Sequence, residues 1–370
     1  MKVSKRRTLR AAIACGTIAT AVMSYANVGS ASAQKAHAAA VAISGAGSTF
    51  AAPVWEQWAS AYHNATVSYN SDGSGAGVTA IQNNIVDFAG DDPPLSATDI
   101  SNATKGPLLD VPVFLGAITI SYHLPGIASG LMLDGPAIAN IYLGKITMWN
   151  DPAIVKLNPK LKKKLPAHAI IVVHRSDSSG TTASFATFLA DVSPTWANTP
   201  GEGTANKAPI WPSGSLGGNG NAGVAVTMQN NVYSIAYVEQ SYALQSKFTV
   251  AAVKNRAGKF VLPTLASTSI AGAGFTPPAN LQFTVVDVSK NKKAYPITSQ
   301  TFAVVYQDMC KVGAPGGQGA ASATKAFLNY GLTTGQKVLK SGDYASLPSN
   351  ISKLAIKQLS HMQCNGSPLS

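Results

Sequence analysis

Three short segments rich in glycine, serine and threonine hold the residues of this chain that are best suited to binding chemistry. They read GAGSTF at 45–50, GSGAG at 73–77 and HRSDSSGT at 174–181. Glycine lets a backbone approach a ligand closely, while hydroxyl groups and the free N–H groups of a helix start donate hydrogen bonds to anions. Arg175 adds a planar fork of donors that matches an oxyanion. If the three segments converge, they form an anion site without a metal or a nucleophile.

The elements around these segments indicate an α/β fold, because short apolar runs alternate with amphipathic stretches from residue 41 onward. Trp55, Trp58 and Tyr62 recur at helical spacing and predict a buried helix that begins at Thr49 or Phe50. Strands are expected at 86–90, 111–121, 170–173 and 234–238. Helices are expected after residues 74 and 179 and at 133–143, 322–339 and 349–361. The region 248–302 is expected to hold strand-like structure with loops.

A glycine-rich stretch at 213–223 contains the spacing GxGxxG at 218–223. This spacing occurs in dinucleotide-binding proteins when it follows a strand and opens a helix. We expect no strand before it, so the sequence predicts a loop and not a nucleotide site.

Asp91 and Asp92 follow the expected strand at 86–90. An ionised carboxylate can only accept a hydrogen bond. A protonated anion such as phosphate supplies that bond, whereas fully ionised sulfate cannot, and a site built this way discriminates strongly. Either aspartate could therefore be a selectivity element, and the alternative is a turn or capping aspartate before Pro93. Asp177 could likewise hold Arg175 or cap the next helix.

The N-terminus has the pattern of a cleaved secretory signal peptide. Five basic residues precede an apolar run at about 11–26, and Ala-Ser-Ala at 31–33 is typical of a cleavage site. We expect residues 1–33 to be removed and the protein to be periplasmic. The segment holds five basic residues and no acidic one, so its removal lowers the net charge from +12 to +7.

The composition excludes some classes of function. No dense stripe of Lys and Arg interleaved with aromatic residues is present, so we expect no nucleic-acid partner. Charged residues make up only 12% of the chain, and the scarcity of carboxylates suits a protein that works in acid. Export places Cys310 and Cys364 in an oxidising compartment, where a disulfide between them and two free thiols both remain open. No metal-ligand spacing is present.

Together, the motifs resemble those of the periplasmic phosphate-binding proteins of high-affinity phosphate ABC transporters. The resemblance covers essentially the whole chain after the N-terminal segment. Beyond the three segments it includes VDF at 86–88 before Asp92-Pro93, YLGKI at 142–146 with Trp149, GGNGN at 217–221, IAYVE at 235–239, ITS at 297–299 with TF at 301–302, and DYASLP at 343–348.

The resemblance implies a two-lobed periplasmic solute-binding protein fold of type II, with the ligand cleft between the lobes. Lobe I would comprise residues 41–120 and 248–370, and lobe II residues 121–247. The resemblance also implies that the protein is a binding protein and not an enzyme, and that it uses no cofactor. It would capture inorganic phosphate and deliver it to the permease subunits of an inner-membrane ABC transporter. We expect a monomer.

The resemblance also implies the residues that hold phosphate. Carried over by position, they are Thr49, Phe50 through its backbone N–H, Ser74, Asp92 as proton acceptor, Arg175, Ser179, Gly180 and Thr181. Asp177 would hold Arg175 without touching the ligand. Asp91 stands where the family has a small residue, and we expect it to point outward as a surface residue.

Two other functions share part of this pattern. A binding protein for another tetrahedral oxyanion, such as sulfate or molybdate, would use the same segments, but the charge of Asp92 disfavours a fully ionised ligand. A secreted serine hydrolase or phosphatase would use Ser179 or Ser74 as nucleophile. We expect neither a hydrolase nor a phosphatase, because no His–Asp pair is placed to activate a serine and no metal cluster is present in the sequence.

Overall fold

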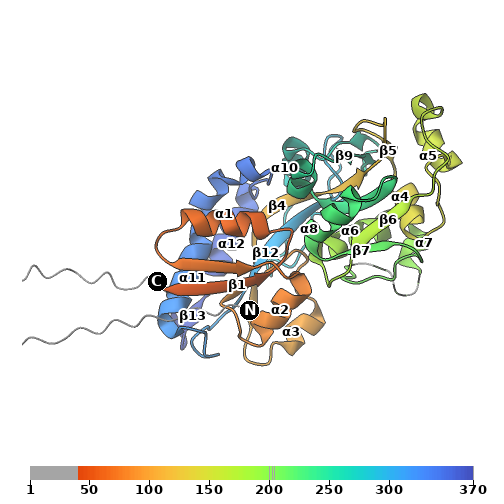
Figure 1. Ribbon diagram of the computed structural model, residues 1–370. Helices are drawn as coiled ribbons and strands as arrows, with labels where there is room; N and C mark the ends of the chain where they lie inside the picture. Colours follow the sequence, from red (N-terminus) through yellow and green to blue (C-terminus); the bar gives the residue numbers. More distant parts are fainter. Residues whose placement is uncertain (1–40, 200, 202, 204, 370) are drawn as a thin grey trace, which may run out of the picture. The chain divides into compact units, whose positions relative to one another are not determined.

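The computed structural model describes residues 41–199, 201, 203 and 205–369. The predicted signal peptide lies outside these residues. In the described part of the chain, no helix is both long and apolar enough to cross a membrane. Helices and strands alternate as expected for an α/β fold (Figure 1).

One large sheet forms the centre of the described chain. Its strands lie in the order β2-β1-β3-β12-β4-β8-β6-β7, with β9 beside β4. Their bounds are β1 Ala42–Gly47, β2 Thr66–Asn70, β3 Phe88–Asp91, β4 Leu108–Tyr122, β6 Ile171–Arg175, β7 Leu216–Gly218, β8 Ser234–Glu239, β9 Thr249–Val250 and β12 Thr298–Tyr306. Two small sheets contain β5 Met132–Leu133, β10 Ala252–Lys254 and β11 Phe260–Val261, and β13 Gln363–Cys364 and β14 Ser367–Pro368.

Strand β4 joins the two sides of this sheet. Its residues 108–117 pair with β12 and residues 118–122 pair with β8, both antiparallel. All of its residues after Leu108 are buried, which fits a nearly continuous apolar sequence covered on both faces. We call β1, β2, β3 and β12 the first half of the sheet and β6, β7 and β8 the second half. In the first half, β1, β2 and β3 run parallel to one another. In the second half, β6, β7 and β8 run parallel to one another.

The bounds of the helices are α1 Ala52–Ala61, α2 Ser74–Gln82, α3 Ala97–Asn102, α4 Gly135–Tyr142, α5 Pro152–Leu157, α6 Gly180–Val192, α7 Pro194–Ala197, α8 Gly220–Gln229, α9 Gln240–Gln245, α10 Leu265–Gly272, α11 Gly317–Leu332 and α12 Ser349–Leu359. Helices α2, α4, α6 and α12 begin within two residues of the expected positions, whereas α11 begins five residues before the expected start at 322. Short 3-10 helices span Pro159–Leu161, Thr334–Lys337 and Leu339–Gly342. Helix α6 is capped by the Ser179 hydroxyl, which accepts a hydrogen bond from the Thr182 N–H.

Three expectations about the elements are wrong. Helix α1 begins at Ala52, because residues 49–51 form a turn before it. The stretch at 213–223 is not only a loop, since β7 precedes the glycine-rich turn and α8 begins at Gly220. The region 248–302 contains α10, which starts with a capping box between Thr264 and Ser267.

Aromatic side chains fill the core beneath the first half of the sheet. Trp55 and Trp58 of α1 are fully buried, and Trp55 packs against Phe88 of β3 at a ring distance of 5.1 Å. Both indoles also contact Phe114 of β4 edge-on. The helix is therefore fixed on the sheet, which places the turn that precedes it at the carboxyl end of β1.

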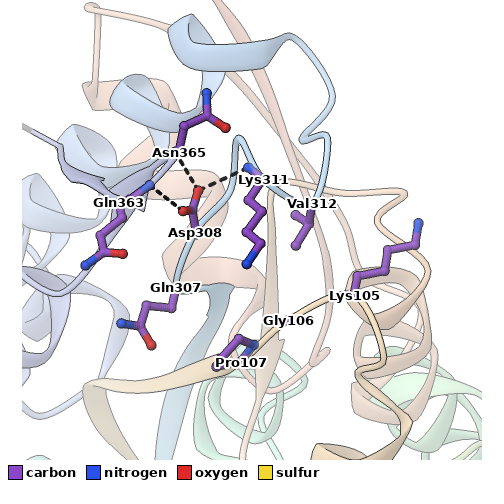
Figure 2. Close-up of a pocket in the computed structure, with 10 residues that line it drawn as sticks. Lys105, Gly106, Pro107, Gln307, Asp308, Lys311, Val312, Gln363 and Asn365 are labelled. Carbon is purple, nitrogen blue, oxygen red and sulfur yellow. Dashed lines mark hydrogen bonds between the residues drawn. The ribbon is translucent and has the colours of Figure 1, made fainter.

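The C-terminal segment is tied down covalently. Cys310 and Cys364 form a disulfide, which settles the choice that the sequence leaves open. Beside it lies a cavity of about 570 Å³ (Figure 2). The Asp308 carboxylate at this cavity accepts hydrogen bonds from the backbone N–H groups of Lys311, Asn365 and Gly366. Because its oxygens are already engaged, Asp308 serves to hold the C-terminal hairpin.

Candidate anion-binding site

The predicted segments lie at the carboxyl ends of parallel strands, where ligands bind in open α/β sheets. β1, β2, β6 and β7 each lead through a short turn into a helix, namely α1, α2, α6 and α8. Hydrogen bonds join the two halves at this edge. The Gly75 N–H donates to the Ser178 carbonyl at 3.1 Å, and the Asn221 N–H donates to Thr49 Oγ1 at 3.1 Å. The structure thus brings all three segments and the start of α8 together.

Asp92 is held at the centre of this edge by two hydroxyl groups. Its Oδ1 accepts hydrogen bonds from Ser48 Oγ at 2.7 Å and from Thr301 Oγ1 at 3.0 Å. Its Oδ2 is buried and has no hydrogen-bond partner among the described residues, and the same is true of Ser74 Oγ. Unpaired buried polar atoms are costly and rare, so these two atoms indicate a place for a ligand.

Both unpaired atoms face the first residue of α6. A Cβ atom added to Gly180 would lie 2.4 Å from Ser74 Oγ and 2.6 Å from Asp92 Oδ2. The N–H groups of Gly180 and Thr181 belong to the first turn of α6, where a helix leaves its N–H groups without carbonyl partners. At the start of α6, Asp92 therefore supplies a hydrogen-bond acceptor, Ser74 supplies a hydroxyl, and the first turn of the helix supplies free N–H donors.

The protonation of Asp92 is tuned by its surroundings. Burial raises the pKa of Asp92 to about 7, with the hydrogen bond from Ser48 opposing this rise and the nearby charge of Asp91 adding to it. A carboxyl with this pKa is able to share a proton with a ligand near neutral pH. In its ionised form this group accepts a hydrogen bond from an anion that carries a proton, as the sequence suggests.

Arg175 is held in place by Asp177. The guanidinium donates from Nε to Asp177 Oδ1 at 2.7 Å and from its second terminal nitrogen to Oδ2, a bidentate ion pair. The Gly220 N–H also donates to Asp177 Oδ1, at 3.0 Å. Burial alone would raise the pKa of Asp177, but the hydrogen bonds and charge of Arg175 outweigh it and keep the pKa below its usual range. The geometry is that of a fixed guanidinium whose other terminal nitrogen reaches Thr181 Oγ1 at 3.4 Å.

Asn221 is a residue of the site that sequence reasoning missed. Its side chain is buried, and Nδ2 donates to Thr49 Oγ1 at 3.0 Å and to Thr181 Oγ1 at 3.2 Å. Its Oδ1 accepts from the Glu239 N–H at 3.0 Å, which fixes the orientation of the amide. Asn221 therefore links the threonines of the first and third segments. The signal was its place at the start of the helix after the glycine-rich motif, which sequence reasoning treated as a loop.

The remaining predicted residues contribute backbone groups or caps. Phe50 is fully buried, and its carbonyl accepts a hydrogen bond from the Tyr344 hydroxyl at 2.7 Å. The Thr49 carbonyl accepts from the Tyr242 hydroxyl at 2.9 Å. Because these carbonyls are held by tyrosines of the distant C-terminal segment and of α9, the turn at 49–51 has a fixed orientation. The Ser179 hydroxyl accepts from Thr182 and keeps its proton available for a second bond.

The expectation that Asp91 points outward is wrong. Its carboxylate is fully buried and forms an ion pair with Lys207 at 2.8 Å. Its Oδ1 also accepts from the Asp92 N–H at 2.9 Å. Burial raises the pKa of Asp91, and the charge of Lys207 limits that rise. The physical reason is that β3 is a central strand, between β1 and β12, and all of its residues are buried, so side chains on both of its faces are covered.

Ser74 and Ser179 are the serines that a hydrolase would use as nucleophile. In the described residues, neither Ser74 nor Ser179 makes a hydrogen bond to a histidine. The same part of the chain contains no group of three or more His, Cys, Asp or Glu residues that could hold a metal ion. The side chains that converge are hydrogen-bond donors and the carboxyl group of Asp92, whose Oδ2 has no partner among the described residues, and this arrangement suits binding.

Comparison with known proteins agrees with this geometry. The profile described as "PBP superfamily domain" matches residues 32–334. The chain is 38% identical over 318 residues to "Phosphate-binding protein PstS" of Xylella fastidiosa (strain 9a5c), covering 85% of this chain and 83% of the relative. It is 37% identical over 317 residues to the protein of the same name from Pasteurella multocida (strain Pm70), covering 84% and 87%.

A solved structure supports the fold. The crystal structure of a phosphate-binding protein from Stenotrophomonas maltophilia superposes with a TM-score of 0.65 at 21% identity, covering 86% of this chain and 94% of that one. The expected periplasmic solute-binding protein fold is thereby confirmed. The chain belongs to the PBP superfamily and, within it, to the family of the phosphate-binding proteins PstS.

Proposed function

We propose that this protein captures inorganic phosphate at the site around Asp92 and delivers it to an ABC transporter for import. The observation that carries the proposal is the pair of unpartnered buried atoms, Asp92 Oδ2 and Ser74 Oγ, at the start of α6. The relatives named as phosphate-binding proteins support it, and a protein of this fold from Vibrio cholerae is described as an ABC-type phosphate transport receptor.

The donors and the acceptor suit phosphate better than sulfate. The N–H groups at the start of α6, the hydroxyls of Ser74 and Thr49 and the guanidinium of Arg175 bind the anionic oxygens. Asp92 accepts the hydrogen bond of a phosphate O–H. Sulfate at neutral pH has no proton to give, so its oxygen would face the Asp92 oxygen with like charge.

Hydrogen bonds between the two halves of the sheet support a binding cycle in which the halves close on the ligand. We infer that residues 41–120 with 248–370 form one lobe and residues 121–247 the other, and that the lobes close on phosphate around β4. The ligand-bound monomer then docks on inner-membrane permease subunits. The N-terminal segment directs the protein to the periplasm, a compartment in which the disulfide between Cys310 and Cys364 persists. Binding and release require no chemical step.

Calorimetry tests the proposal directly. Ligand-stripped protein is titrated with phosphate, with sulfate and with molybdate, and the titrations are repeated with Asp92→Asn. We expect one phosphate per chain, no response to sulfate, and relaxed discrimination in Asp92→Asn. Asp87→Asn is the matched control, because Asp87 is a buried aspartate with one unpartnered oxygen near the other end of β3. Sulfate or molybdate binding without phosphate binding would overturn the proposal.

A further inference from the structure

The buried ion pair between Asp91 and Lys207 connects the two halves of the molecule. Asp91 ends β3 in the first half, and its side chain is 0% exposed. Lys207 lies between α7 and β7 of the second half, and its side chain is 19% exposed. The two charged groups are 2.8 Å apart, although 116 residues separate them in the chain. Charges removed from water in this way interact strongly and are costly to leave unpaired.

Each partner is attached to a part of the anion site. The Asp92 N–H donates to Asp91 Oδ1 at 2.9 Å, so the carboxylate of Asp91 orients the backbone of the proton acceptor. On the other side, the Ser179 N–H donates to the Lys207 carbonyl at 3.1 Å. The Ala205 N–H donates to Thr187 Oγ1 of α6 at 3.1 Å. Lys207 is therefore fixed to the helix whose first residues face the ligand position.

The charge of Asp91 is a problem for an anion site. It stands next to Asp92, and a second buried negative charge there repels a bound anion. Lys207 is the cation that offsets it, and the ammonium arrives from the opposite half. Building on the proposed function, we propose that Lys207 is a positioning residue that neutralises Asp91 when the halves close, so that the protein binds phosphate tightly without Lys207 contacting it.

A set of charge variants tests this inference by phosphate titration. Lys207→Met should weaken phosphate binding about 30-fold or more, as expected when one partner of a buried charge pair is removed. Asp91→Asn should bind phosphate as tightly as the parent protein or more tightly, because Asn retains the Oδ1 that accepts from the Asp92 N–H. The Lys207 ammonium that loses its partner is 19% exposed, so water still solvates it, and its positive charge attracts the anion. The double variant should return to within about threefold of the parent, because no unpaired charge remains. Lys207→Arg should retain binding.

Recovery of phosphate binding in the double variant separates the proposed charge-neutralising role of Lys207 from a merely structural one. If the double variant binds as weakly as Lys207→Met, or if Lys207→Met binds normally, the inference is overturned. Lys162→Met, a change at an exposed lysine of the second half, is the control for loss of a positive charge. Should Lys207→Met not fold by circular dichroism, Lys207→Gln takes its place. A loss of more than tenfold in Asp91→Asn would independently overturn the idea. Failure of the folded parent protein to bind phosphate would instead refute the proposed function.

Discussion

Gly180 is the position where a single added methyl group should weaken phosphate binding while leaving the fold intact. Its backbone has no positive φ, so alanine fits the first turn of α6 without strain. The added Cβ would nevertheless lie 2.4 Å from Ser74 Oγ and 2.6 Å from Asp92 Oδ2. Real Cβ atoms do not approach other atoms this closely, so something must move.

The two neighbours differ in their freedom to move. The Ser74 hydroxyl can rotate, because it has no partner among the described residues. Asp92 cannot, since its other oxygen is held by Ser48 and Thr301. The halves of the sheet must therefore stay further apart in Gly180→Ala. Overpacking of this kind costs about 1–3 kcal/mol, which corresponds to roughly 5- to 150-fold weaker phosphate binding.

The assay is phosphate calorimetry combined with thermal unfolding of the ligand-free protein. We expect weaker binding and an unchanged or slightly higher unfolding temperature, because alanine is favoured over glycine in helices. Gly319→Ala in α11 is the matched control, since its added Cβ would meet only Val41 Cγ2 at 3.8 Å. If Gly180→Ala binds phosphate within about threefold of the parent, the close approach of α6 to Asp92 does not occur in the bound state.

Three further predictions concern affinity, stability and pH. Asn221→Ala should weaken phosphate binding about tenfold, because Thr49 and Thr181 lose the amide that orients them; calorimetry measures this. The Cys310→Ser, Cys364→Ser double variant should lose about 4 kcal/mol of unfolding free energy in denaturant titrations, given the 54-residue separation. Burial raises the pKa of Asp110 to about 7, so the folded protein keeps a proton that the unfolded chain releases above about pH 4. The unfolding free energy should therefore fall as pH rises from about 5 to 7, by up to about 1.4 kcal/mol per pH unit for each such group, and Asp110→Asn should flatten this slope.

The sequence predicts those parts of the site that depend on short-range order. Glycine and serine before an amphipathic stretch specify the starts of α2 and α6, and the Ser179 cap is a local hydrogen bond. Arg175 and Asp177 stand two residues apart, so their pairing is also within reach of sequence reasoning. These features need no knowledge of the distant chain.

The parts that the sequence does not reveal depend on contacts between distant segments. Side chains alternate along a strand, so if Asp92 faces the ligand, Asp91 should face away. The prediction that Asp91 lies at the surface was wrong, because the side of β3 that faces away from the ligand is covered by protein. β3 is a central strand, and Lys207 covers its end. Thr301 reaches Asp92 from 209 residues away, and only the antiparallel pairing of β12 with β3 brings it there.

The charges around the site explain why hydrogen bonding, and not net charge, should determine selectivity. Arg175 is matched by Asp177 and Lys207 by Asp91, so both cations are offset by carboxylates. Among the residues described here, Asp92 has no cation in an ion pair with it. A site with no surplus positive charge cannot hold an anion by attraction alone. It must rely on N–H groups, hydroxyls and a proton shared with Asp92, and an anion without a proton lacks the last of these.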